Sequence, residues 1–420
     1  MIAPIFYSIV LCLSLGFFLI GPQRKYKILG IILISEYFFI SVCSIVMFAN
    51  NYTDYSRVTL LPYIVLLVSY TLTFSPFLSL RNNFKVDKID IKFHKVYYYL
   101  AIIYIGFSLV SILIYLPKVN EIITQNDWAM QRLLYYRGEQ TQVYTNFFER
   151  MSLNFVNYFK LFALLIYFIL LKYDIKKRFR LVLLICIISN VFLSAINSVS
   201  RGSIFDFFIL FIAIFLFFRN GLSIKIKKSL TILIISIGVI FGFYALSVTI
   251  SRFSSSNSLD ASSLDSLIDY FGQAPLVFNQ GVYPVVNHTY GVYSFGKLFE
   301  LFGTEIYYPH QSEIGGSWGS GFYTYVGLIF IDFGISGVII HGLFIHFILS
   351  YFIKKNKFKL SDMFLIFLIY EYLLKGGFVI GRNYIVGLLV LISIYTAMCF
   401  IEKIKISESS NNYINLSSNK

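Results

Sequence analysis

Long apolar runs are the feature of this sequence that most restricts its fold. Eleven can be drawn, and most are long enough, at about 1.5 Å per helical residue, to cross a hydrocarbon core roughly 30 Å thick. They cover residues 4–21, 28–49, 60–80, 97–116, 154–171, 181–198, 203–218, 229–250, 324–352, 360–380 and 384–401. Apolar residues make up 57% of the 420-residue chain. The sequence therefore predicts an all-α polytopic membrane protein with about eleven transmembrane helices.

Two parts of this pattern are unusual. The runs 181–198 and 203–218 are short and joined only by Val199 to Gly202, which predicts a tight helical hairpin. The run 324–352 is longer than one span requires, which predicts a re-entrant or interfacial turn followed by a span. Because no linker or internal repeat interrupts the chain, residues 1–406 are predicted to form one membrane domain. The Ser/Asn-rich residues 407–420 are predicted to be a disordered cytoplasmic tail.

The gaps between the runs alternate in their basic residues. One set holds 19 Lys and 5 Arg, and the other holds 2 Lys and 7 Arg. The Lys-rich set marks the cytoplasmic side, so the N-terminus is predicted to lie outside and the C-terminus inside. The first run is not expected to be a cleaved signal, because Arg24, Lys25 and Lys27 follow it and no charge precedes it. The basic charge is therefore explained by topology and membrane lipids, and no nucleic-acid partner is expected.

Arginine on the predicted outer side is not required by topology. The planar guanidinium suits phosphate and carboxylate groups better than the ammonium of lysine does. Arg201 lies in the hairpin turn, Arg252 at the end of a span, and Arg382 in the turn before the last span. For each one the alternative is contact with lipid headgroups, but three at one membrane edge favour a bound anion such as a diphosphate. The other outer arginines are interpreted as resting on headgroups: Arg57, Arg132, Arg137 and Arg150.

Few other residues within the runs suggest chemistry. Glu371 and Lys375 are spaced i, i+4 and are predicted to pair on one helix face. Lys375 is one and a half to two helical turns from Arg382, so both are predicted to line one outward-facing cavity. The four cysteines lie in apolar runs without metal-ligand spacing, so neither a disulfide nor a metal site is expected. No cofactor-binding motif is present in the sequence.

Two large outer loops are predicted, at 117–153 and 251–320. In the first, residues 126–137 predict a short amphipathic helix that either rests on headgroups or faces the substrate. In the second, another amphipathic helix is predicted from about 263 to 271. Beyond it, aromatic residues accompanied by scattered acids indicate either a sugar-binding surface or an ordinary aromatic belt. These residues are Tyr283, His288, Tyr290, Tyr293, Tyr307, Tyr308, His310 and Trp318.

The segment 315–337 ends in Asp332-Phe-Gly-Ile-Ser-Gly337. Together with the Ser200-Arg-Gly-Ser203 hairpin and the long loop before it, this segment resembles the O-antigen polymerase (Wzy-type) family. The resemblance implies a GT-C-like fold in the bacterial inner membrane and a metal-independent glycosyltransferase of surface polysaccharides, such as lipopolysaccharide or capsule. The reaction implied is transfer of a glycan from an undecaprenyl-diphosphate carrier to a sugar hydroxyl of another lipid-linked unit. A chain-length regulator is an implied protein partner.

The resemblance also implies roles for individual residues. The donor diphosphate would be bound by Arg201, Arg252, Arg382 and Lys375. The base that accepts the proton of the attacking hydroxyl would be His310, Glu313 or His288. Asp332 is expected to be structural. Three alternatives remain open: a flippase or exporter of lipid-linked oligosaccharide, an O-antigen ligase that differs only in its acceptor, and a membrane O-acyltransferase.

Overall fold

The structure, a computed structural model, is mainly helical in the residues that it describes. These are 2–20, 27–50, 58–78, 95–125, 127–137, 144, 146–173, 176–254, 263–318, 323–355, 358–378 and 384–403. Within these ranges no β-strand element forms, and ten helices are long and apolar enough to cross a membrane. The prediction of an all-helical, multi-pass membrane protein is therefore confirmed.

The predicted apolar runs correspond to the long helices of the described ranges. These are α1 (Ile2–Ile20), α2 (Ile28–Ala49), α3 (Leu60–Leu78), α4 (Lys95–Gln125), α6 (Phe147–Lys172), α7 (Lys177–Asn197), α8 (Gly202–Phe218), α9 (Ile224–Ser254), α12 (Thr324–Ile353), α13 (Leu360–Lys375) and α14 (Tyr384–Lys403). Shorter helices lie between them: α5 (Trp128–Arg137), α10 (Ser263–Val277) and α11 (Val292–Leu301), with single turns η3 (Arg219–Gly221), η4 (Phe278–Val282) and η5 (Gln311–Ile314).

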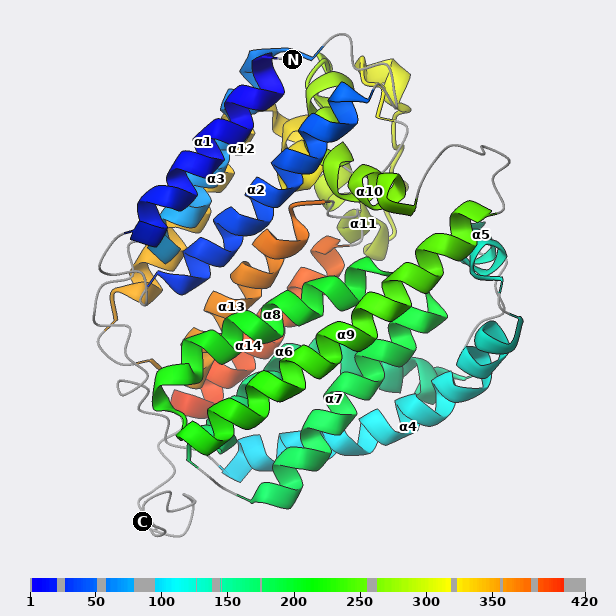
Figure 1. Cartoon of the computed structure of the whole chain (residues 1–420), viewed down its shortest axis with the longest axis vertical. Coiled ribbons are helices and arrows are strands. Elements are labelled where there is room, and N and C mark those ends of the chain that lie inside the picture. Colours follow the sequence, from blue (N-terminus) through cyan, green and yellow to red (C-terminus); the bar gives the residue numbers. More distant parts are fainter. Residues whose placement is uncertain are drawn as a thin grey trace. The chain divides into compact units, whose positions relative to one another are not determined.

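The chain divides into two compact units. The first unit comprises residues 1–88, 264–356 and 368–393, and the second comprises 89–263, 357–367 and 394–420. In the first, α1, α2, α3 and α12 pack against one another; in the second, α4, α6, α7, α8 and α9 do so (Figure 1). The single membrane domain predicted for residues 1–406 stays a prediction. Its tail, 407–420, lies outside the described residues.

Several buried tyrosines of the first unit's core have hydrogen-bonded hydroxyls. The Tyr325 hydroxyl lies 3.1 Å from the Ser69 Oγ and 3.0 Å from the Thr73 Oγ1, which joins α12 to α3. The Tyr37 hydroxyl donates to the Leu373 carbonyl at 2.7 Å. Buried hydroxyls need such partners because an unsatisfied polar group in an apolar interior costs about 1–3 kcal/mol. The polar contacts therefore fix which faces of these helices meet.

The over-long run at 324–352 is broken at one residue. Gly334 has φ 62° and ψ −157°, and it divides α12 into a short segment before it and a longer one after it. This backbone conformation is essentially restricted to glycine, since a Cβ would clash with its own chain. The short segment is largely buried, and it includes the fully buried Asp332. The break predicted from the length of the run thus lies within the Asp-Phe-Gly motif.

Helix α13 is shorter than the predicted span 360–380. It has 16 residues, about 24 Å of helix at 1.5 Å per residue. The backbone turns after Lys375, because the carbonyls of Gly376 and Phe378 accept hydrogen bonds from Tyr325 and Thr324, both at 2.8 Å. A Cβ on Gly376 would lie 2.6 Å from the Tyr325 ring, so glycine permits this close approach. The end of α13 is therefore set by contact with the start of α12.

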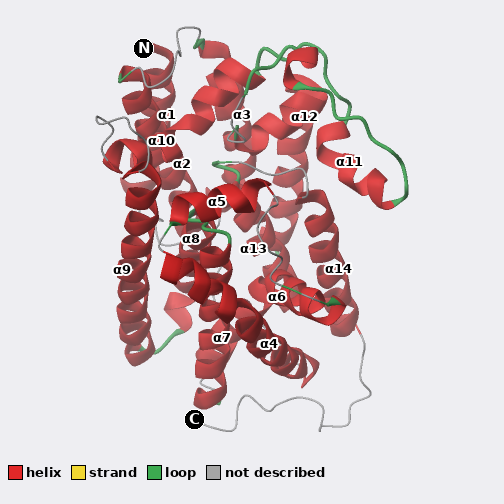
Figure 2. Cartoon of the chain, turned by 90° about the vertical axis from the view of Figure 1, so that its right-hand side faces the viewer, coloured by secondary structure: helices red, strands yellow, loops and turns green. Residues whose placement is uncertain are grey.

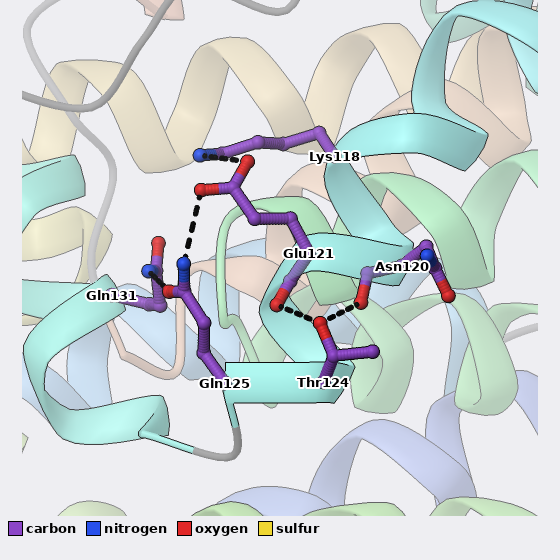
Figure 3. Close-up of polar contacts among 6 residues, drawn as sticks. All are labelled: Lys118, Asn120, Glu121, Thr124, Gln125 and Gln131. Atoms are coloured by element: carbon purple, nitrogen blue, oxygen red, sulfur yellow. Dashed lines mark hydrogen bonds and ion pairs between the residues drawn. The ribbon is translucent and has the colours of Figure 1, made fainter.

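The predicted outer loop 117–153 contains more helix than expected at both of its ends. Helix α4 continues to Gln125, beyond the apolar run, and α6 begins at Phe147, where the Asn146 side chain caps it by accepting from the Glu149 N–H at 2.9 Å. Figure 3 shows how polar contacts extend α4: Lys118 pairs with Glu121 at 3.0 Å, and Gln125 donates to Glu121 at 3.3 Å. Such i, i+3 and i, i+4 contacts stabilise helix that lies outside an apolar run.

The predicted loop 251–320 also contains more helix than expected. Helix α9 continues to Ser254, and the amphipathic helix predicted from about 263 to 271 is confirmed as α10. A second helix, α11, was not predicted, and Figure 2 shows it beside α12. Its apolar residues Phe295, Leu298 and Phe299 follow the i, i+3, i+4 spacing, which is the signal that the sequence contained.

Candidate functional site

The hairpin turn between α7 and α8, residues 198–201, places Arg201 at a defined position. At the end of α7 the Ser200 N–H donates to the Ala195 carbonyl at 2.8 Å, and Val199 adopts a φ of 46°. A β-branched residue rarely takes this left-handed conformation, so the surrounding contacts must hold it. Arg201 directly precedes α8, whose first N–H groups and positive dipole end favour nearby anions. The tight hairpin predicted from the sequence is therefore confirmed.

Helix α5 docks on this hairpin turn. The Arg132 Nη1 donates to the Ser198 carbonyl, and Figure 1 shows α5 beside one end of α9. The Trp128 ring packs edge-to-face on Tyr244 of α9, with centroids 5.9 Å apart, and the Tyr244 hydroxyl donates to the Ala195 carbonyl at 3.1 Å. A small buried cluster completes the contact; its members are Ile122, Trp128, Val199 and Val248. The predicted interfacial helix of the first loop thus packs against protein.

The other predicted diphosphate ligands are only partly described. Arg252 lies in the last turn of α9, but its side chain is outside the described part, and Arg382 lies entirely outside it. The predicted pair in α13 is confirmed, since the Lys375 Nζ lies 2.5 Å from the Glu371 Oε1. Lys375 belongs to the first unit and Arg201 to the second. The convergence of these four cations therefore stays a prediction.

His310 and Glu313 come together at the η5 turn of the first unit. The Glu313 N–H donates to the His310 carbonyl at 3.0 Å, and the His310 Nδ1 lies 2.9 Å from the Ser312 Oγ. The Tyr307 hydroxyl donates to the Glu313 Oε2 at 2.6 Å, and this hydrogen bond lowers the pKa of Glu313 below that of an ordinary carboxyl. The side chains of His310 and Glu313 are both exposed. They are therefore open to a substrate hydroxyl.

His288 lies in the same loop but faces α12. The Val286 N–H donates to the Ile314 carbonyl at 3.1 Å, which brings this part of the loop next to η5. The His288 ring meets Phe330 edge-to-face at 5.5 Å, and its Nδ1 is buried without a hydrogen-bond partner among the described residues. A Cβ on Gly334 would lie 2.7 Å from the His288 Nε2. His288 therefore packs on the break in α12.

Asp332 anchors the loop to α12. Its Oδ2 accepts from the Ser294 N–H at 2.7 Å, and its Oδ1 accepts from the Tyr293 N–H at 3.0 Å and from the Thr289 hydroxyl. Tyr293 and Ser294 belong to the first turn of α11, where N–H groups lack partners within the helix. The carboxyl group of Asp332 thus caps α11 from a distant part of the chain. These contacts agree with the structural role expected for Asp332.

The predicted aromatic surface divides into buried and exposed rings. Tyr293 and Trp318 are only 2% and 4% exposed, and their rings pack 6.1 Å apart, so neither presents a face for a sugar. These two rings form the interior of the loop, so they do not belong to a sugar-binding surface. Tyr290 and Tyr307 are 85% and 72% exposed and keep an accessible ring. Those two residues remain able to stack on a pyranose.

A shallow open depression lies in the loop after α11. Its volume is about 420 Å³, and its lining includes Glu300, Thr304 and Glu305. The Lys297 Nζ lies 2.6 Å from the Glu300 carboxylate, and this hydrogen bond lowers the pKa of Glu300. The exposed Phe302 lies between these carboxylates in the sequence. The carboxylates of the lining can accept hydrogen bonds from sugar hydroxyls.

Comparison with known proteins found no relative of this chain. No protein-family model, curated protein or solved structure matches it.

Proposed function

We propose that this chain polymerises lipid-linked oligosaccharide repeat units at the outer face of the bacterial inner membrane. The proposal includes a GT-C-like fold, with the N-terminus outside and the C-terminus in the cytoplasm. The observation that carries it is the role of Asp332. This residue of the family-like motif binds Thr289 and the first turn of α11, in the loop that also bears His288, His310 and Glu313. The motif thus acts on the loop in which catalysis is expected.

The reaction would be a single glycosyl transfer. The oxygen of an acceptor hydroxyl attacks the anomeric carbon of the donor glycan, and the bond from that carbon to the diphosphate oxygen breaks. The diphosphate leaves with the electron pair on its lipid carrier, stabilised by Arg201, Arg252, Arg382 and Lys375. The hydroxyl proton passes to a base in the loop. These steps require a clamp of positive charge and one proton acceptor.

The local contacts favour His310 as that base. The hydrogen bond from Tyr307 lowers the pKa of Glu313, which makes this carboxylate a weaker proton acceptor. His288 faces Phe330 and the break in α12, whereas His310 is exposed on the loop. Glu313 is then better suited to orient a substrate hydroxyl. The exposed Tyr307 ring beside it offers a surface on which an acceptor sugar can stack.

A surface-glycan ladder in cells tests this function. In a strain deleted for the gene, Arg201→Ala should leave single repeats and abolish long chains, because the leaving diphosphate loses a ligand. The matched control is Arg150→Ala, since Arg150 lies against the Tyr144 ring at 5.8 Å and is not assigned to the diphosphate. Chains of normal length in Arg201→Ala would refute the proposal.

The same experiment separates the alternatives. If the chain is a ligase, the Arg201→Ala strain should transfer no glycan to the final acceptor, not even single repeats. A flippase or exporter requires that undecaprenyl-linked units accumulate on the cytoplasmic side, which protection from an impermeant sugar-oxidising reagent would reveal. A polymerase predicts neither result, because single units are still exported and transferred.

A further inference from the structure

Arg132 and Arg201 lie in segments far apart in the sequence, but the second unit brings both to one place. Arg132 is on α5, and its Nη1 donates to the carbonyl of Ser198, three residues before Arg201. Both guanidinium groups are close enough to the Tyr244 hydroxyl to interact with it electrostatically. The sequence alone assigned Arg132 to lipid headgroups. The structure instead places it beside the arginine that was assigned to the diphosphate.

The position of Arg132 is fixed by packing. Trp128, one helical turn before it, is 8% exposed and belongs to the buried cluster that includes Val199. Gln131, the neighbouring residue, donates to the Gln125 side chain at 2.5 Å, so α5 is also tied to the end of α4 (Figure 3). A side chain that only reaches headgroups would not need a docked helix. The contacts hold Arg132 at the hairpin turn before any ligand arrives.

An anion with several oxygens can accept hydrogen bonds from two arginine side chains at once. Arginine forks bind phosphate oxygens in pairs, so adjacent arginines suit a diphosphate better than a single carboxylate. We propose that Arg132 and Arg201 together bind the diphosphate of the lipid-linked substrate, with Arg132 supplied by the docked helix α5. This inference rests on the proposed polymerase function and adds a residue of the first loop to the diphosphate site.

Diphosphate binding can be measured without any glycosyl transfer. The full chain is purified into nanodiscs of zwitterionic phosphatidylcholine, and inorganic pyrophosphate and farnesyl diphosphate are titrated by calorimetry. Arg132→Ala should weaken both at least about tenfold, as expected for loss of one charge-assisted contact. Arg132→Lys should recover part of the affinity because it restores the charge without the fork. The matched control, Arg150→Ala, should bind like the wild type.

A second variant separates binding from the docking of α5. Trp128→Phe loosens the contact with Tyr244 but leaves the charge of Arg132 in place. Trp128→Phe should retain affinity within about threefold of wild type, because it keeps the charged contact of Arg132. Loss of that contact in Arg132→Ala should weaken binding at least about tenfold. Wild-type affinity in Arg132→Ala would overturn the inference. An equal loss of affinity in Trp128→Phe and Arg132→Ala would also overturn it, because the role of Arg132 would then be structural.

Lipid headgroups carry phosphate as well, so the last comparison is between nanodiscs of phosphatidylcholine and of phosphatidylglycerol. If phosphatidylglycerol displaces pyrophosphate from the wild type, the arginine pair is a headgroup site and the inference fails. Retained pyrophosphate affinity in phosphatidylglycerol supports it. The outcome is independent of the polymerase test. If pyrophosphate binding depends on Arg132 but the glycan ladder of Arg201→Ala is unchanged, the proposed function alone is refuted. If the ladder of Arg201→Ala loses its long chains but pyrophosphate binding does not depend on Arg132, this inference alone is refuted.

Discussion

Replacement of Asp332 should release the loop that carries the candidate bases. Its carboxyl group accepts three hydrogen bonds, from the Ser294 and Tyr293 N–H groups and the Thr289 hydroxyl, and it is fully buried. In Asp332→Asn one oxygen becomes an NH₂ group, so one of the two carboxyl positions can no longer accept. Whichever way the amide turns, a backbone N–H of α11 meets a donor or loses its acceptor.

The size of the effect follows from these contacts. Loss of one hydrogen bond to a charged acceptor costs about 1.5–3 kcal/mol, so Asp332→Asn should make local opening of α11 roughly tenfold to a hundredfold easier. Asp332→Ala loses all three contacts and should cost at least about 3 kcal/mol, since the cap and the buried polar partners are lost together.

Hydrogen exchange detected by mass spectrometry measures this opening directly. Peptides that cover residues 289–302 should exchange faster in Asp332→Asn, while peptides of α7 and α8 should keep their rates. Asp127 offers a matched control: its exposed Oδ1 caps helix α5 by accepting from the Met130 N–H at 3.0 Å. Asp127→Asn should change little, because the two residues cap about equally well. Unchanged exchange of 289–302 in Asp332→Asn would refute the anchoring role.

Two further predictions concern the same loop. Gly334→Ala should destabilise the protein by roughly 1–3 kcal/mol, since the backbone at this position is strained for other residues and a Cβ would lie 2.7 Å from the His288 Nε2. Thermal unfolding measures the effect, with Gly106→Ala as the control: a Cβ there meets open space in α4, so this variant should be as stable as the wild type or more stable. Equal melting temperatures of the two variants would contradict the prediction. Tyr307→Phe should raise the pKa of Glu313 back toward that of an ordinary carboxyl, because the hydrogen bond that lowers this pKa is lost. In the wild type that contact stabilises the fold above pH about 4.3, and the stabilisation is lost as the pH falls through the lowered pKa. Infrared titration of the Glu313 carboxylate band, identified by its loss in Glu313→Gln, measures the pKa, and an unchanged pKa in Tyr307→Phe would contradict the prediction.

The long helices could be predicted because each signal is local. Apolar runs of span length become helices in any arrangement of the chain, since an unpaired backbone in lipid is too costly. The excess length of 324–352 pointed to a break, and Gly334 supplies the only kind of residue that its conformation accepts. The tight hairpin followed equally from the four residues between its two runs.

Other elements depended on contacts that no local pattern contains. Helix α11 is capped by Asp332, which lies 39 residues from Tyr293 in the sequence. The length of α13 is set by pairing of Gly376 and Phe378 with the start of α12. Polar contacts after Pro117 prolong α4 beyond its apolar run, so hydropathy ended the helix too early.

The same reason limits what could be predicted of the site. Arg201 could be singled out because a cation in a four-residue turn at a membrane edge is unusual. Arg132 could not, because its partner at Ser198 is 66 residues away and its helix was expected to lie on headgroups. Tyr293 and Trp318 were counted among residues of a sugar-binding surface or an aromatic belt, but they are buried, since composition does not tell which side of a loop an aromatic ring faces.

The central claim is that the chain joins lipid-linked repeat units, and purified protein can test it most directly. The full chain is reconstituted in vesicles with undecaprenyl-diphosphate-linked repeat units from its own bacterium, and the products are resolved by length. The proposed function predicts glycans of two or more units together with released undecaprenyl diphosphate, and loss of both in Arg201→Ala. Movement of the lipid-linked unit across the vesicle membrane without any elongation would contradict it.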